Sequence, residues 1–205
     1  MKTAIIFDCE FLAIEGSPQR FWCGPFDPDP VVAQIGAVRL GLEDDFPLID
    51  SLSLLVKPLD RHGQAYRIDP FLTELTGITG QQIKEDGLAL ADALGQLDRF
   101  SQGSNLFSWG KDEFNLVAIS SYVSGIAPPI PATRFGNACN LLLAAGMAYE
   151  AIRTTRSNSL PAYFGITHPP LKAHDAADDA RAVAYTLQHL LRLGRLAPRL
   201  LTDAE

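Results

Sequence analysis

Apolar residues along the chain first follow short β-type runs and later follow helical spacing. The run TAIIFD (residues 3–8) is apolar, β-branched and too short for a helix, which predicts a buried strand that ends in a carboxylate. Residues 31–40 and 49–58 predict two more strands, joined as an antiparallel hairpin by the acidic turn at 43–45. Strands followed by alternating strands and helices indicate an α/β fold with a mixed central sheet flanked by helices.

The second half of the chain carries the helical pattern. Leucines at spacings of three and four mark one face of a helix over 88–100. The last helix, over 176–193, has the longest apolar stripe. The other elements predicted in the same way are short helices over 70–75 and from 81, strands over 105–109 and 132–138, and helices over 113–123, 141–149 and 159–166, the last with Ser159 as its cap.

Residues 13–30 interrupt this pattern with four prolines and two glycines, which predicts a long loop. Loops beyond about 12–15 residues are uncommon in compact domains and are often functional. The length of 205 residues suits a single domain over 1–205, with 13–30 as an inserted loop and 194–205 as a C-terminal tail.

The composition, with 47% hydrophobic and 20% charged residues, is that of a globular protein and excludes disorder for most of the chain. No apolar run approaches the ~18 residues of a membrane span, and Asp8 and Glu10 interrupt the only run that could resemble a signal peptide. We therefore expect a cytoplasmic protein without membrane contact. The net charge of −7 argues against a broad basic surface that grips duplex DNA. Three scattered cysteines predict neither disulfides nor a zinc site.

Asp8 and Glu10 are the first candidate functional residues. They lie two residues apart at the end of the first strand, so alternation places both on one face and Cys9 on the other. Two adjacent carboxylates raise each other's pKa unless a cation neutralises them. The alternative is a strand end at which both acids are simply hydrated.

The last helix carries a more specific signal. Asp179 falls within its apolar stripe, where a buried carboxylate needs a partner, and no lysine or arginine follows it at three or four residues. Asp175 is explained as the N-cap and Asp178 as a first-turn acid that complements the helix dipole. His174 directly precedes the helix, where it could reach the same cleft or have a structural role.

Asp112 is a further candidate, because it follows the apolar strand NLFSWG and opens a helix. An aspartate in that position is also a common N-cap. Together, these oxygen ligands suit Mg²⁺ or Mn²⁺. Two such ions ~3.5–4 Å apart can stabilise both the attacking and the leaving oxygen of a phosphoryl displacement.

The segments FDCE, WGKD and HDAADDA, in this order, resemble the DEDDh exonucleases of the RNase H-like superfamily, over about residues 3–192. The resemblance implies an RNase H-like fold in which Asp8, Glu10, Asp112 and Asp179 bind two Mg²⁺ or Mn²⁺ ions and His174 is the general base. It implies a 3′-5′ exonuclease that releases 5′-mononucleotides from single-stranded or short RNA or DNA. Phe11 and Leu12 would stack on the terminal base, with core packing as their alternative role.

The middle motif departs from the family pattern. Relatives with Trp-Gly before this acid have two intervening residues, whereas Lys111 alone separates Gly110 from Asp112. A strict count places Glu113 at the metal position. The helical positions of Leu116 and Val117 favour Asp112. Both acids therefore stay candidates.

Two other functions are compatible with the same residues. One is a catalytically inactive module on the same fold that binds nucleic acid or protein, because fold does not establish function. The other is a metal phosphohydrolase that acts on small nucleotides. The expected partner is nucleic acid with an accessible 3′ end, and the sequence is compatible with a homo-oligomer.

Overall fold

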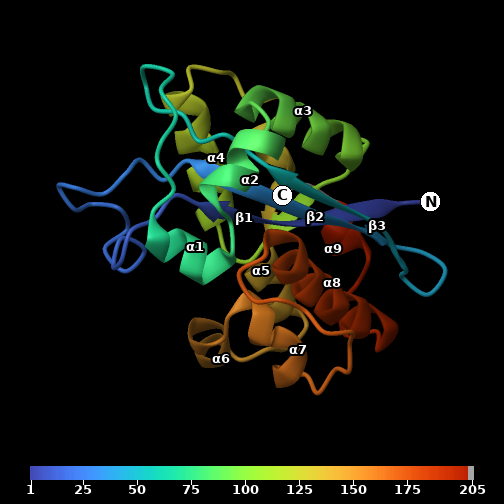
Figure 1. Cartoon of the computed structure of the whole chain (residues 1–205). Helices are drawn as coiled ribbons and strands as arrows, with labels where there is room; N and C mark the ends of the chain where they lie inside the picture. The colour runs from blue at the N-terminus through green and yellow to red at the C-terminus, as the bar shows by residue number, and fades with distance from the viewer. Residues whose placement is uncertain (203–205) are drawn as a thin grey trace.

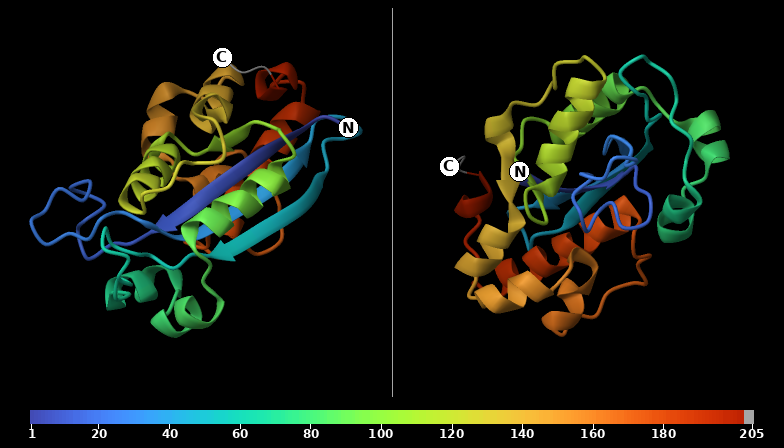
Figure 2. Two further views of the ribbon diagram at one scale, coloured as in Figure 1. Left: turned by 90° about the horizontal axis from the view of Figure 1, so that it is seen from above. Right: turned by 90° about the vertical axis from the view of Figure 1, so that its left-hand side faces the viewer.

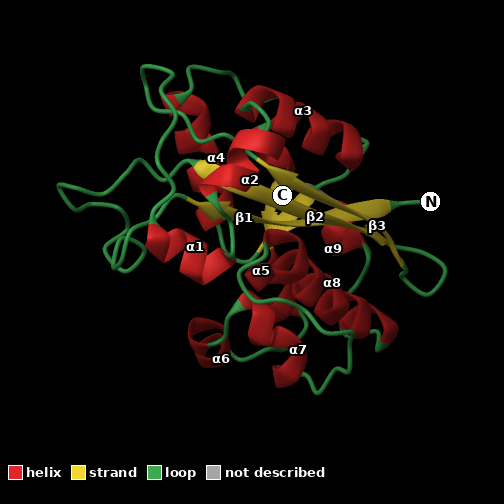
Figure 3. Cartoon of the chain, in the orientation of Figure 1, coloured by secondary structure: helices red, strands yellow, loops and turns green. Residues whose placement is uncertain are grey.

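The computed structural model describes residues 1–202 and contains a five-stranded sheet with the order β3-β2-β1-β4-β5 (Figures 1 and 3). β2 pairs antiparallel with β1 and β3, whereas β4 pairs in parallel with β1 and β5. The predicted hairpin and mixed sheet are confirmed. The strands are β1 (Thr3–Phe11), β2 (Val32–Gly41), β3 (Leu48–Leu55), β4 (Leu106–Ser108) and β5 (Phe135–Asn137).

Helices cover both faces of this sheet, with α3 and α4 on one side and α5, α7 and α8 on the other (Figure 1). None of the helices described within residues 1–202 is long and apolar enough to cross a membrane. The α-helices are α1 (Pro70–Thr76), α2 (Gly80–Asp86), α3 (Leu90–Ser101), α4 (Asp112–Val123), α5 (Ala138–Ala144), α6 (Tyr149–Thr154), α7 (Leu160–Tyr163), α8 (Ala176–Arg192) and α9 (Arg199–Thr202), and 3₁₀ turns cover Ala132–Arg134 and Ser157–Ser159.

The alternation of β1 separates two hydrophobic cores. Its even-numbered residues Ala4 and Ile6 pack with α5 and α8, whereas Ile5, Phe7 and Cys9 pack with α3 and α4. Because side chains alternate along a strand, Asp8 and Glu10 continue the row that faces α8. The predicted separation of these acids from Cys9 is confirmed.

β2 and α8 approach each other closely at Gly36. A Cβ atom at this position would lie 2.1 Å from the backbone of Ala176 and Ala177, the first residues of α8. Gln34 fixes the same turn, because its amide oxygen accepts a hydrogen bond of 3.1 Å from Ala176 N–H and its Nε2 lies 3.3 Å from Asp175 Oδ2. β2 therefore positions the N-terminus of α8 beside β1.

Gly36→Ala is expected to lower the free energy of unfolding by at least about 1–3 kcal/mol, because the added methyl group would clash with the backbone of α8. Gly95→Ala is the matched control: it lies inside α3, where the nearest atom is the flexible end of Arg99 at 3.5 Å. Alanine there is expected to add ~0.5–1 kcal/mol. Urea denaturation measures both, and equal midpoints for Gly36→Ala and wild type would contradict this packing.

The structure corrects several predicted boundaries in the second half. The helix expected over 141–149 ends at Ala144, and α6 begins at Tyr149, because Gly146 takes a left-handed φ of 89° between them. The strand expected over 132–138 shortens to β5 after a 3₁₀ turn. Ser159 precedes α7, but its hydroxyl bonds the backbone of Arg156 and does not cap the helix.

The segment 194–205, expected as a tail, packs onto the core in the part that the structure describes. Leu196 and Leu201 are buried beside α8 and α5, and α9 forms within this segment. Residues 203–205 lie outside the described residues. The last leucines therefore contribute to the fold.

Candidate active site

Asp8 and Glu10 lie at the end of β1, on the face that α8 covers. Asp8 is buried and Glu10 is partly buried. Burial raises the pKa of Asp8 well above its usual range, and the charges of Glu113, Glu10 and Asp179 raise it further. The two acids are thus part of a larger group of carboxylates and are not a hydrated strand end.

Asp179 reaches the same place from the first turn of α8. It is buried, as predicted, and its Oδ2 accepts a hydrogen bond of 3.2 Å from the backbone N–H of His174. Asp175 is the N-cap, also as predicted, and accepts from the backbone N–H groups of Ala177 and Asp178. The cap and Asp179 together fix the residues immediately before the helix.

His174 completes this side of the site. Its side chain is exposed, and one ring nitrogen and single carboxylate oxygens of Glu10 and Asp179 all lie within 4.8 Å of one another. Its backbone takes a left-handed φ of 59°, which is uncommon for a residue other than glycine. The hydrogen bond to Asp179 therefore holds the histidine in an unusual conformation that aims it at the carboxylates.

The structure places Glu113, and not Asp112, among the carboxylates. α4 begins at Asp112, which is exposed, and the next residue, Glu113, is buried against Asp8. Asp112 is not among the charges that shift the pKa of Asp8 or Glu10. The Oε2 atom of Glu113 is buried and has no hydrogen-bond partner among the described residues. The geometry therefore favours the strict count of the motif over the helical pattern that pointed to Asp112.

This group has the chemistry of a site for hard divalent cations. Burial and neighbouring carboxylates raise the pKa of Glu10 to about 8, and burial is the main cause that raises the pKa of Glu113 to about 7 and of Asp179 to about 6. Buried like charges destabilise one another unless a cation compensates them. The unpartnered oxygen of Glu113 is a free ligand atom. Asp8, Glu10, Glu113 and Asp179 thus fit Mg²⁺ or Mn²⁺.

Without metal, the protein is expected to lose stability as the pH rises from about 4 to about 8. A carboxyl with a raised pKa binds its proton more tightly in the folded state, so stability is greatest below the unfolded pKa and falls as the folded group ionises. Mg²⁺ or Mn²⁺ should reduce this fall. Thermal unfolding in EDTA between pH 5 and 8.5 tests it, with Glu10→Gln expected to weaken the dependence. A metal-free melting temperature that rises over this range would contradict the prediction.

Phe11 and Leu12, the residues expected to stack on a base, differ in their surroundings. Pairing of β1 with β2 shifts register between Glu10 and Phe11, so the alternation does not continue to Leu12. Leu12 is 2% exposed and packs with Val31 in a small core. The burial of Leu12 therefore favours core packing over stacking on a base. Phe11 is partly buried against the α3 side of the sheet.

Sequence reasoning did not identify Gln34 and Lys172 as supporting residues. Lys172 donates a hydrogen bond of 2.6 Å from Nζ to the carbonyl oxygen of Thr76, and its charge lowers the pKa of Glu10. Gln34 is buried in β2. A glutamine inside an otherwise apolar strand was the available signal for Gln34, whereas nothing local marks Lys172.

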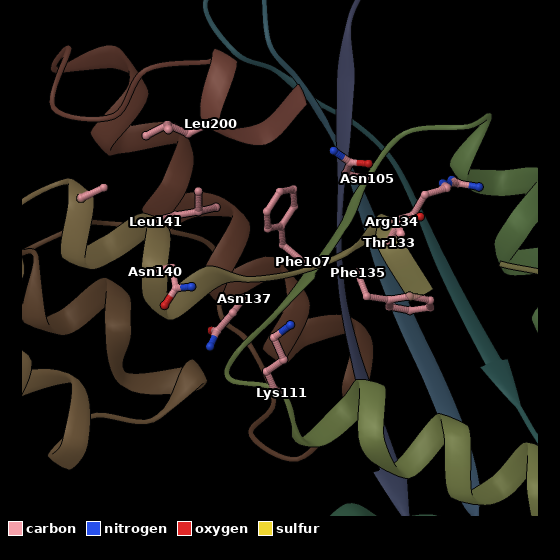
Figure 4. Close-up of a pocket in the computed structure, with 12 residues that line it drawn as sticks. Asn105, Phe107, Lys111, Thr133, Arg134, Phe135, Asn137, Asn140, Leu141 and Leu200 are labelled. Atoms are coloured by element: carbon pink, nitrogen blue, oxygen red, sulfur yellow. The ribbon is translucent and has the colours of Figure 1, made fainter. Parts of the chain in front are cut away.

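Two cavities have linings that do not include the carboxylates. One, of about 180 Å³, opens along β5, where the Phe107 ring and the Lys111 side chain point into it (Figure 4). Another, of about 620 Å³, begins at Leu12 and Ala13, shortly after Glu10, and extends along the 13–30 loop. The residues that line the second cavity therefore begin two positions after Glu10 along the chain.

The known proteins that resemble this chain in sequence or in fold are exonucleases. The family model RNase_T, described as exonuclease, matches residues 5–187. The nuclease domain of 3′hExo, a DEDDh family member bound to rAMP, has a TM-score of 0.75 at 18% identity, over 95% of this chain and 94% of that chain. E. coli exonuclease I bound to a dA16 oligonucleotide has a TM-score of 0.61 at 18% identity, over 98% of this chain and 42% of that chain.

A third solved structure, of a 3′-exonuclease in 3′-end specific recognition of a histone mRNA stem-loop, has a TM-score of 0.73 at 17% identity, over 95% of this chain and 84% of that chain. No curated protein sequence matches the chain. At these identities the solved structures establish the fold, which is the RNase H-like α/β fold of DEDDh nuclease domains, as the sequence predicted.

Proposed function

This chain belongs to the exonuclease family, and we propose that it is a metal-dependent 3′-5′ exonuclease that releases 5′-mononucleotides from single-stranded or short RNA or DNA. The observation that carries the proposal is the meeting of Asp8, Glu10, Glu113 and Asp179 from β1, α4 and α8, with His174 beside them. A fold with one acid missing would favour a binding module. Here each position of the motif has a carboxylate.

We infer that Asp8, Glu10, Glu113 and Asp179 hold two divalent ions. Bound there, the ions would neutralise the cluster and stabilise charge on the oxygens of the phosphodiester. Glu113 takes the third position because its oxygen is buried and unpartnered, whereas Asp112 faces solvent. The Ser108 side chain at the end of β4 lowers the pKa of Glu113 and so favours its charged form.

His174 is proposed as the general base. Histidine is the side chain that binds and releases a proton near neutral pH. The ring is exposed to water, and one ring nitrogen lies within 4.8 Å of carboxylate oxygens of Glu10 and Asp179, so the imidazole is accessible beside the proposed metal ligands. It would accept the proton of the attacking water, and the phosphodiester bond of the terminal nucleotide would break as the new P–O bond forms.

A degradation ladder tests this function. Single-stranded RNA and DNA oligomers with a 5′ label should shorten stepwise in Mg²⁺ or Mn²⁺ and stay intact in EDTA. His174→Ala should slow each step by about 10²-fold or more. Appearance of the label in a mononucleotide at the first step would show attack from the 5′ end and would refute the proposed direction. Hydrolysis of dinucleotides alone would favour a phosphohydrolase of small nucleotides.

A further inference from the structure

The loop over residues 13–30, here called the β1–β2 loop, has a defined structure. Its base is closed by a hydrogen bond of 2.9 Å from Leu12 N–H to the carbonyl of Val31. The indole of Trp22 donates to the carbonyl of Leu12 at 2.6 Å, and Ser17 is fully buried. Figure 2 shows the loop, in blue, extending beyond the end of the sheet. Loops that are packed by their own side chains are frequently functional.

The loop forms one wall of the cavity of about 620 Å³. The opposite wall is the segment 66–70, which leads into α1. The Tyr66 hydroxyl donates to Asp29 Oδ2 at 2.9 Å and so joins the two walls. Pockets of ~300–1,000 Å³ hold small-molecule ligands, and this one has the size for about one or two nucleotides.

Each carboxylate that lines the cavity already has a hydrogen-bond or ion-pair partner. Asp27 pairs with Arg20, Asp29 accepts from Tyr66, and Asp69 accepts from the backbone N–H of Phe71. Arg67 lines the cavity as well, and its side chain has no ion pair or hydrogen bond within residues 1–202. Arg67 is thus a cation of the cavity wall without a carboxylate partner, and its guanidinium is free to contact a phosphate group.

Phe26 is the second group free for a ligand. It lies in the cavity wall with 89% of its surface exposed, and it contacts no other aromatic ring within the described part of the chain. What distinguishes Phe26 from other exposed apolar residues is its place in a cavity wall that also contains Arg67. Aromatic side chains stack on bases of any sequence, which is how single strands are bound without sequence readout.

The cavity lies next to the active site along the chain, because Leu12 and Ala13 line it and follow Glu10 by two and three residues. We propose that it binds the unpaired nucleotides that lie beyond the first one on the 5′ side of the scissile bond, with Phe26 stacked on a base and Arg67 on a phosphate. This inference rests on the proposed exonuclease function and adds a substrate requirement. Because the loop and the segment 66–70 enclose the cavity on two sides, we expect a single strand to enter it more readily than a paired end.

The test compares Phe26→Ala and Arg67→Gln on 5′-labelled oligomers from two to eight nucleotides. Both variants should raise KM for the longer oligomers by about 10-fold and leave dinucleotide hydrolysis within about 2-fold of wild type. Arg67→Gln should also reduce the slope of log KM against log salt by about 0.7 for longer oligomers. The matched controls are Phe21→Ala, an exposed ring of the same loop outside the cavity, and Arg153→Gln on α6.

Binding separates this inference from the proposed function. Fluorescence anisotropy with a labelled eight-nucleotide single strand in EDTA should show about 10-fold weaker binding for both cavity variants and wild-type binding for both controls. The inference is overturned if the cavity variants bind and hydrolyse all lengths as wild type does. If wild type hydrolyses nothing but the cavity variants still bind more weakly, the exonuclease proposal fails and the strand-binding site stands.

Discussion

Glu113→Gln is expected to lower kcat of the proposed nuclease by about 10³-fold or more, whereas Asp112→Asn should stay within about 2-fold of wild type. The difference follows from position: Glu113 is buried beside Asp8 with an unpartnered oxygen, and Asp112 points to solvent one residue earlier. Loss of a ligand that supports several kcal/mol of charge stabilisation converts to a rate factor of this order. Glutamine keeps the size of the side chain and removes the charge.

Steady-state hydrolysis of one labelled oligomer at saturating Mn²⁺ measures both variants. Thermal unfolding of each variant serves as the control for folding. If Asp112→Asn loses activity and Glu113→Gln keeps it, the third ligand is the one that the helical pattern indicated, and the assignment of Glu113 is wrong.

Asp8→Asn is expected to abolish activity and to stabilise the metal-free protein. Asp8 is surrounded by the charges of Glu113, Glu10 and Asp179, which together with burial raise its pKa. Removal of one charge from this group relieves repulsion, and each kcal/mol corresponds to about 2–4 °C in melting temperature for a chain of this size. The gain should be largest near pH 8 and should vanish near pH 4, where the carboxyl groups are protonated in both proteins.

The measurement is thermal unfolding of wild type and Asp8→Asn in EDTA at several pH values, followed by the same series in Mg²⁺. Metal should raise the melting temperature of wild type more than that of the variant. The two melting temperatures should therefore converge, or wild type should become the more stable protein. A variant that is less stable than wild type in EDTA at pH 8 would show that Asp8 has a structural role that outweighs charge repulsion.

Much of this site could be predicted from local sequence. The apolar run before Asp8 defines a strand, and alternation alone places Asp8 and Glu10 on one face. The spacing of Asp179 within the apolar stripe of α8 predicted its burial, and Asp175 was recognisable as a cap. These features depend on one element at a time, and the structure confirms them.

The differences between the sequence-based expectations and the structure arise where two elements meet. The choice between Asp112 and Glu113 depends on how α4 rotates against β1, and the helical pattern of Leu116 and Val117 does not fix that rotation for the first turn. Leu12 enters the core because β1 changes register after Glu10. The close contact of Gly36 with α8 joins residues that are 140 positions apart in the chain (36 and 176). Local patterns carry no signal for such contacts.

The most direct test of the account is a titration of the purified protein with Mn²⁺ at pH 7.5. The electron paramagnetic resonance signal of the free ion measures how much Mn²⁺ is bound. Wild type is predicted to bind two Mn²⁺ per chain. Glu113→Gln should lose at least one of these sites, and Asp112→Asn should keep both. Wild type that binds no Mn²⁺ at millimolar concentration, or Glu113→Gln that binds two ions as tightly as wild type, would contradict the proposed metal centre.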